Sequence, residues 1–111
     1  MDKKGQEILL KILKHGQNTV NYTASCKSLE DFEKDSMCAE ATVFNLMQIG
    51  ELAKFSLSDD TKKEIKTIPW NQLYGMRNRI VHGYEGVNMQ IVWDTVKEDI
   101  PDLCDEIKKL I

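Results

Sequence analysis

Residues that interrupt regular structure are scarce in this 111-residue sequence, which contains two prolines and six glycines. It has no low-complexity tract, internal repeat or flexible linker. Its hydrophobic fraction of 41% and charged fraction of 30% are those of a soluble globular protein, which argues against a disordered chain. The length suffices for one core and is too short for two, so the sequence predicts a single domain over residues 1–111.

Long apolar runs are also absent. No stretch approaches the roughly 18 apolar residues that a membrane span needs. The opening segment, MDKKGQEILLKILKHG, lacks the apolar block and small-residue cleavage site of a signal peptide. The sequence therefore predicts a cytoplasmic protein.

Cysteine and histidine are few. The cysteines Cys26, Cys38 and Cys104 are widely spaced and form no C-x-x-C pair, so we expect buried free thiols in a reducing compartment. With only two histidines, His15 and His82, and no cysteine cluster, the sequence argues against a structural zinc site. No metal or cofactor is expected, and His15 is expected at the surface.

A surplus of positive charge is missing as well. The net charge of −3 argues against a protein coated in basic surface for nucleic acid. The charge is unevenly distributed, however, because residues 62–84 carry five basic residues and one acid, whereas residues 94–106 carry six acids and one lysine. The basic region could form a confined phosphate-binding cleft or simply a solvated face, and the acidic last helix could face a protein partner.

Helical periodicity runs through most of the sequence. Apolar residues recur every three to four positions in predicted helices over residues 3–26, 29–35, 36–56, a turn or two after residue 58, 69–82 and 88–111. Ser28 and either Ser58 or Asp59 are the predicted N-caps, Pro69 suits a first helical turn, and Pro101 predicts a kink or restart. No segment alternates like a strand. The sequence predicts an all-α bundle of four or five helices.

Apolar stripes indicate which faces pack. In the first helix the stripe comprises Ile8, Leu9, Ile12, Leu13 and Val20. In the helix over 36–56 it comprises Met37, Ala41, Phe44, Met47 and Phe55. The other residues expected in the core are Trp70 and Trp93.

The stretch MRNRIVHGYEG, residues 76–86, concentrates reactive side chains. On a regular helix Asn78 and Arg79 each lie next to His82, whereas Arg77 and His82, five positions apart, point about 140° away from each other. A straight helix therefore cannot aim Arg77 and His82 at one phosphate. Either the helix ends before His82 and the glycine-containing loop turns it back, or a neighbouring copy supplies the second group. Both alternatives are open.

Histidine and arginine together could cleave a phosphodiester. A histidine exchanges protons near neutral pH, so it can take the proton of an attacking ribose 2′-hydroxyl or protonate the leaving oxygen. An arginine offers charged, planar donors to phosphate oxygens. The structural alternative is that Arg77 and Arg79 are exposed charges, that His82 interacts with the helix dipole, and that Tyr84 packs in the loop.

One acid outside this stretch is notable. Glu51 follows Gly50 in an otherwise apolar helix. It could reach the site and orient an arginine, although a solvent-facing or core-edge position is the favoured expectation.

Three blocks of the sequence together resemble the HepT-like toxins of the HEPN superfamily. Residues 77–84 match the R-x-x-x-x-H-x-Y motif of that family, including the polar Asn78 after the arginine. The blocks LMQIGELAK, IPWNQLYGMRNRIVHGY and VWDTVKEDIPDL occur in the same order as in the family. The resemblance covers most of the chain.

This resemblance implies an all-helical HEPN domain that acts as a homodimeric, metal-independent RNase toxin. Arg77 and His82 would be catalytic at a cleft between the two copies. Asn78 would orient one of them or the RNA, and Arg79 would support the site. The substrate would be RNA, with tRNA and mRNA as candidates.

The resemblance also implies a protein partner. Toxins of this family pair with an MNT-type nucleotidyltransferase antitoxin that transfers AMP to the motif tyrosine, here Tyr84. Added phosphate charge and bulk beside His82 would inactivate the site. The alternative is a non-catalytic helical subunit that binds nucleotide or RNA within a nucleotidyltransferase complex.

Overall fold

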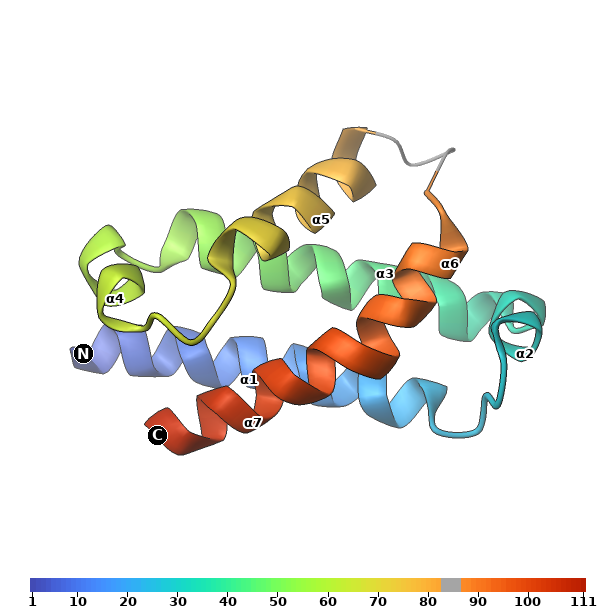
Figure 1. Ribbon diagram of the computed structural model, residues 1–111, viewed down its shortest axis with the longest axis horizontal. Coiled ribbons are helices and arrows are strands. Elements are labelled where there is room, and N and C mark those ends of the chain that lie inside the picture. Colours follow the sequence, from blue (N-terminus) through green and yellow to red (C-terminus); the bar gives the residue numbers. More distant parts are fainter. Residues whose placement is uncertain (83–86) are drawn as a thin grey trace.

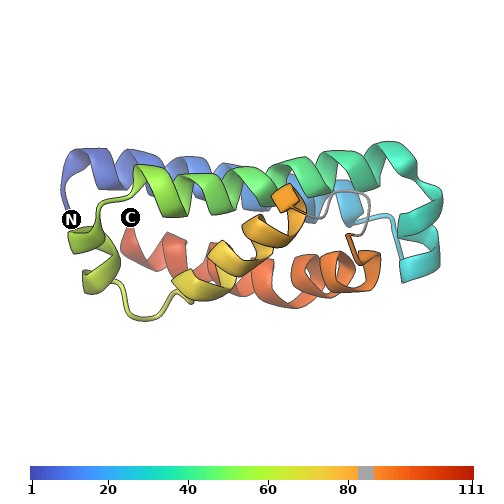
Figure 2. The same cartoon turned by 90° about the horizontal axis from the view of Figure 1, so that it is seen from above.

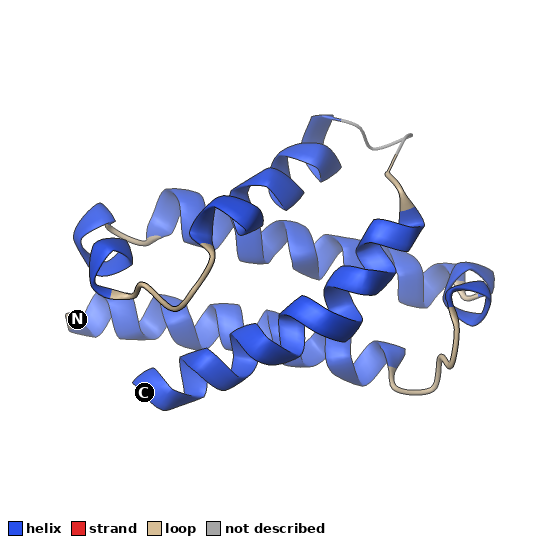
Figure 3. Ribbon diagram, in the orientation of Figure 1, coloured by secondary structure: helices blue, strands red, loops and turns tan. Residues whose placement is uncertain are grey.

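The computed structural model describes residues 1–82 and 87–111, and its ordered elements are all helices over those ranges (Figures 1 and 3). The long helices are α1 (Lys3–Thr23), α3 (Ser36–Glu51), α5 (Trp70–His82) and α7 (Ile100–Leu110). The shorter ones are α2 (Leu29–Lys34), α4 (Asp59–Glu64) and α6 (Met89–Asp94). Two π-helical turns, η1 (Leu52–Ser56) and η3 (Thr95–Asp99), extend α3 and join α6 to α7. The predicted all-α bundle is confirmed.

Side-chain caps set the helix starts close to where the sequence predicts them. Ser28, Asp35 and Ser58 each accept a hydrogen bond from the backbone N–H three residues further on. Pro69 directly precedes α5, and its carbonyl accepts two N–H groups of the first turn. The irregularity predicted at Pro101 is η3, which lies immediately before α7.

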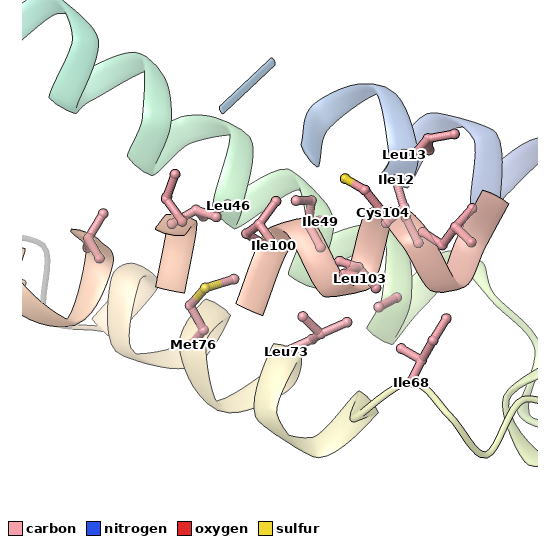
Figure 4. Packing of buried hydrophobic residues seen from close by; sticks show 14 of the residues in the cluster. Ile12, Leu13, Leu46, Ile49, Ile68, Leu73, Met76, Ile100, Leu103 and Cys104 are labelled. Atoms are coloured by element: carbon pink, nitrogen blue, oxygen red, sulfur yellow. The ribbon is translucent and has the colours of Figure 1, made fainter. Parts of the chain in front are cut away.

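Four helices build the core. α1 packs along α3, α7 lies on α1, and α5 lies on α3, while both chain termini are at the same end of the bundle (Figures 1 and 2). Figure 4 shows side chains of α1, α3, α5 and α7 meeting in this layer. The fully buried aliphatic residues include Leu9, Ile12, Leu46, Ile49, Ile100 and Ile107. Each such burial stabilises the fold by about 1.5–3 kcal/mol.

The predicted apolar stripes are partly wrong. The first helix buries its stripe except for Val20, which is 38% exposed. In α3 and η1, Met37, Phe44 and Phe55 are 82%, 53% and 62% exposed. An apolar helix offers more than one face with a spacing of three to four residues, and here a different one, containing Leu46, meets the core.

The predicted burial of the cysteines is confirmed, whereas the positions predicted for His15 and the tryptophans are not. The three cysteines are buried and free, as expected. The surface position expected for His15 is wrong, because His15 is half-buried and its Nδ1 lies 2.8 Å from Oδ1 of the buried Asn45. Trp70, Trp93 and Met47 are half-buried and pack against the core rather than within it. No helix of the described ranges combines the length and the apolar character needed to cross a membrane.

Candidate active site

Helix α5 carries the candidate site. Its buried side consists of Leu73, Met76 and Ile80. Arg77 and Asn78 lie half-buried beside this side, whereas Arg79 and His82 are exposed. Because α5 continues through His82, the alternative in which the helix ends before this histidine is wrong for this chain. Arg77 and His82 of one chain consequently diverge by about 140° around the helix.

Arg77 is held by an acid from another helix. Its Nε donates to Oε1 of Glu51 at 2.6 Å, and its Nη1 donates to Oδ1 of Asn78 at 2.9 Å. A guanidinium has five N–H donors, so these two bonds leave three for which the described residues provide no recorded acceptor. The position of Glu51 at the site, which the sequence raised but did not favour, is confirmed.

The ion pair fixes geometry more than it stabilises the fold. The side chain of Glu51 is 34% exposed and that of Arg77 is 16% exposed. Water screens such a pair, so it contributes about 1 kcal/mol or less to the free energy of unfolding. Its main effect is to orient the guanidinium, which keeps three further N–H donors.

Gly50 lets α5 approach α3 closely enough for this pair. A Cβ atom built on Gly50 would overlap Cβ of Arg77 and lie 2.9 Å from its Cγ and 3.1 Å from the carbonyl oxygen of Leu73. Only glycine therefore fits at this crossing without a shift of α5. Sequence patterns do not reveal this contact, because Gly50 and Arg77 are far apart along the chain.

An exposed aromatic ring lies beside the arginine. The guanidinium carbon of Arg77 is 5.1 Å from the ring centroid of Phe55, and Nζ of Lys54 is 5.6 Å from the same centroid. These are cation–π distances. Phe55, expected in the packing stripe, thus belongs to the surroundings of the candidate site.

His82 borders a cavity on another side of α5. The cavity has a volume of about 520 Å³, and Asn78, Arg79 and His82 line it together with residues of the α6 region. Asn78 is thus the link between the two groups, since it bonds to Arg77 and also lines the cavity beside His82. Tyr84 lies outside the described residues.

Over the described ranges no three His, Cys, Asp or Glu side chains gather as a metal-binding group. The polar groups that do gather are the guanidinium of Arg77, the carboxylate of Glu51 and the amide of Asn78, and the imidazole of His82 lies on the cavity that Asn78 also lines. Such groups can bind a phosphate and exchange a proton.

Comparisons with known proteins agree with the sequence resemblance. The family described as "Ribonuclease HepT-like" matches residues 9–110. A protein named as a ribonuclease of HepT type from Thermococcus cleftensis is 40% identical over 81 residues, which are 73% of this chain and 73% of that relative. No solved structure matches.

Two further relatives carry RNase names. One, from Caldanaerobacter subterraneus subsp. tengcongensis, is 37% identical over 84 residues, 76% of this chain and 74% of the relative. Another, from Methanocaldococcus jannaschii, is 30% identical over 112 residues, 100% of this chain and 91% of the relative.

Proposed function

Because the chain belongs to the HepT-like ribonuclease family, we propose that it is a metal-independent RNase toxin that cuts RNA with Arg77 and His82. The ion pair of Arg77 with Glu51 carries the proposal. It holds a guanidinium in place and leaves donors free for a phosphate. An exposed helix charge would need no such anchor.

The proposed reaction uses the 2′-hydroxyl of the RNA. His82 accepts the proton of this hydroxyl as its oxygen attacks the adjacent phosphorus and forms a 2′,3′-cyclic phosphate. The bond to the 5′-oxygen breaks as that oxygen takes a proton from water and leaves as a hydroxyl. Arg77 stabilises the negative charge that builds on the phosphate oxygens. Asn78 orients Arg77, and Arg79 adds positive charge to the cavity beside His82.

The divergence of Arg77 and His82 favours a site shared by two copies. In a homodimer, Arg77 of one protomer and His82 of its partner can meet although the two residues of one chain do not. The α3–α5 patch, defined as Phe44, Val81 and the cavity of about 510 Å³ that they line, is a suitable contact surface. Phe44 is 53% and Val81 is 41% exposed, and Val81 directly precedes His82.

Cleavage without metal tests the activity. Purified protein is incubated with RNA in EDTA, and we expect cleavage that falls by about 10²–10⁴ in His82→Ala, the usual contribution of a general acid or base. Arg77→Ala should lose activity to a similar degree while its far-UV circular dichroism persists. Lys11→Ala, which removes an exposed cation from α1, is the matched control. Full cleavage by both site variants contradicts the proposal, and RNA binding without cleavage by the unsubstituted protein favours a non-catalytic binding subunit instead.

We also propose that an MNT-type nucleotidyltransferase antitoxin inactivates the protein by transferring AMP to Tyr84. The tyrosine is two residues from His82, so each attached nucleotide phosphate would place negative charge and bulk where RNA phosphate binds. The measurement is intact mass after co-expression with such a partner. AMP-sized increments that disappear in Tyr84→Phe support the assignment, whereas their persistence in that variant refutes it.

A further inference from the structure

Three cations and two aromatic rings from η1, α4 and α5 lie close together. We call this area the Phe55 surface. The ring centroid of Phe55 is 5.6 Å from Nζ of Lys54 and 5.1 Å from Cζ of Arg77, and Nζ of Lys62 is 5.1 Å from the ring centroid of Tyr74. The Phe55 surface consists of Lys54, Phe55, Lys62, Tyr74 and Arg77.

The ring of Phe55 is exposed and does not contribute the stabilisation that a buried ring would. It is 62% exposed, whereas a fully buried phenylalanine side chain stabilises a fold considerably. The same ring lies at cation–π distance from the guanidinium assigned to phosphate binding. A nucleotide with its phosphate on the free donors of Arg77 therefore has its base within reach of the ring.

The nearby acids do not cancel the positive charge of this surface. Oε1 of Glu51 pairs with Arg77, and Oδ1 of Asp59 lies 3.6 Å from Nζ of Lys62. Lys62 also donates to two backbone carbonyls and has 12% of its side chain exposed, so its role is structural. In the part of the chain that the structure describes, no carboxylate pairs with Lys54, which leaves Lys54 and Arg77 to attract phosphate.

We propose that Phe55 is a stacking platform for an unpaired base next to the phosphate that Arg77 holds, which makes single-stranded RNA the substrate class. The inference rests on the RNase function proposed above. Unpaired bases stack on aromatic rings and on guanidinium planes, whereas the bases of a duplex are already stacked on one another. A paired segment would have to open before Phe55 could bind a base.

Charge distinguishes this surface from a contact between two copies. The cores of protein–protein interfaces are depleted in charged residues, lysine among them, yet cations flank the ring of Phe55. The α3–α5 patch differs, because Glu40 is the one charged residue that the structure records in the lining of its cavity. RNA is therefore the better occupant of the Phe55 surface.

Binding to intact RNA tests the platform. All variants carry His82→Ala so that the RNA is not cut, and fluorescence anisotropy is measured with a labelled unstructured oligonucleotide and with a fully paired duplex of the same composition. We expect Phe55→Ala to weaken single-strand binding about 5- to 150-fold, the range that base–aromatic stacking gives on alanine substitution. Duplex binding should change little, and Phe55→Trp should restore single-strand binding. Tyr22→Ala, which removes an exposed aromatic from α1, is the matched control.

Light scattering on the same samples gives the molecular mass and so shows whether Phe55 lies in a contact between two copies of the chain. An unchanged affinity in Phe55→Ala, or an equal loss for single strand and duplex, overturns the proposal. A change of molecular mass in Phe55→Ala also overturns it and assigns the ring to a contact between copies. A cleavage assay of the protein with His82 intact distinguishes a failure of the stacking proposal from a failure of the RNase proposal. Cleavage that does not depend on Phe55 refutes the stacking role alone, and single-strand binding through Phe55 without cleavage refutes the RNase activity alone. A protein that shows no binding and no cleavage refutes both.

Discussion

Glu51 and Arg77, 26 positions apart in sequence, form an ion pair with Oε1 and Nε separated by 2.6 Å. The carboxylate occupies the Nε side of the guanidinium, and the amide of Asn78 accepts from Nη1. The remaining donors have a defined direction before any substrate binds. Such pre-organisation is what a phosphate-stabilising group requires.

Removing the charge of Glu51 should impair cleavage more than folding. In Glu51→Gln the guanidinium loses its ionic partner and is held less firmly. A displacement of a reacting group by about 1 Å lowers the rate on the order of 10- to 100-fold. We expect the loss in kcat with little change in KM, because substrate binding through the Phe55 surface persists. The thermal midpoint should move only slightly. Glu7→Gln, at an exposed position of α1, is the control, and unimpaired kcat in folded Glu51→Gln contradicts the positioning role.

Gly50→Ala and Gly75→Ala should have opposite effects. At Gly50 the new methyl group meets Arg77 and the backbone of Leu73, and overpacking of this kind costs about 1–3 kcal/mol. At Gly75 the nearest recorded atom is Nη2 of Arg79 at 3.7 Å, so alanine fits and should stabilise the helix by roughly 0.5–1 kcal/mol. Urea unfolding and RNA cleavage are measured on both. A Gly50→Ala protein as stable and active as the parent contradicts the close crossing of α3 and α5.

Mixing two inactive variants should restore activity if the site is shared between copies. In a two-fold dimer of Arg77→Ala with His82→Ala, one site loses both groups and the other keeps both. Random mixing makes about half of the dimers mixed, so about a quarter of the wild-type sites reappear. The variants are mixed after reversible dissociation, and cleavage is compared with that of each variant alone. Recovery no greater than the sum of the two contradicts a shared site.

A charge in the α3–α5 patch should separate the copies. In Phe44→Glu an uncompensated carboxylate would enter an apolar contact, which should weaken the dimer at least about 100-fold. Because Phe44 is half exposed, the monomer should still fold. Light scattering should give the monomer mass, and cleavage should fall at the same chain concentration. Met37→Glu, at an exposed position of α3 outside the patch, should change neither, and a Phe44→Glu protein that stays dimeric would place the contact elsewhere.

Alkaline pH should destabilise the fold through two thiols. Burial raises the pKa of Cys38 and of Cys104. Below the pKa of an unfolded thiol, about 8.5, both cysteines are protonated in the folded and in the unfolded chain. Their contribution to the free energy of unfolding is therefore fully present at such a pH. It is lost as pH rises through the higher folded pKa, because the unfolded chain then releases protons more readily. The free energy of unfolding at about pH 7 and about pH 9.5 should differ less in a variant with both cysteines replaced by alanine, and an equal difference in parent and variant contradicts the effect.

The helices and their starts could be predicted because their signals are local. Ser28 and Ser58 cap the turns that directly follow them, and Pro69 precedes a helix whose periodicity is read from its own residues. The motif in α5 could be located for the same reason. The roles of Arg77, His82 and Tyr84 remain predictions.

The surroundings of Arg77 could not be predicted because they come from another helix. A lone glutamate in an apolar segment was the one signal for Glu51, and the same pattern suits a glutamate at the edge of a core. The exposure of Phe55 could not be predicted, because helical spacing does not distinguish a face that meets the core from one that stays exposed to solvent. The need for glycine at position 50 could not be predicted, because it arises from the close approach of α5 to α3.

The course of α5 through His82 also bears on when the protein can act. On the proposed shared site a lone chain is latent, because Arg77 and His82 point to different sides of its own α5. Below the dissociation constant of the dimer, the rate of RNA cleavage then rises with the square of the chain concentration, and above it the rise is linear. Sparse synthesis would leave the chains inert, whereas a burst of synthesis would switch them on together.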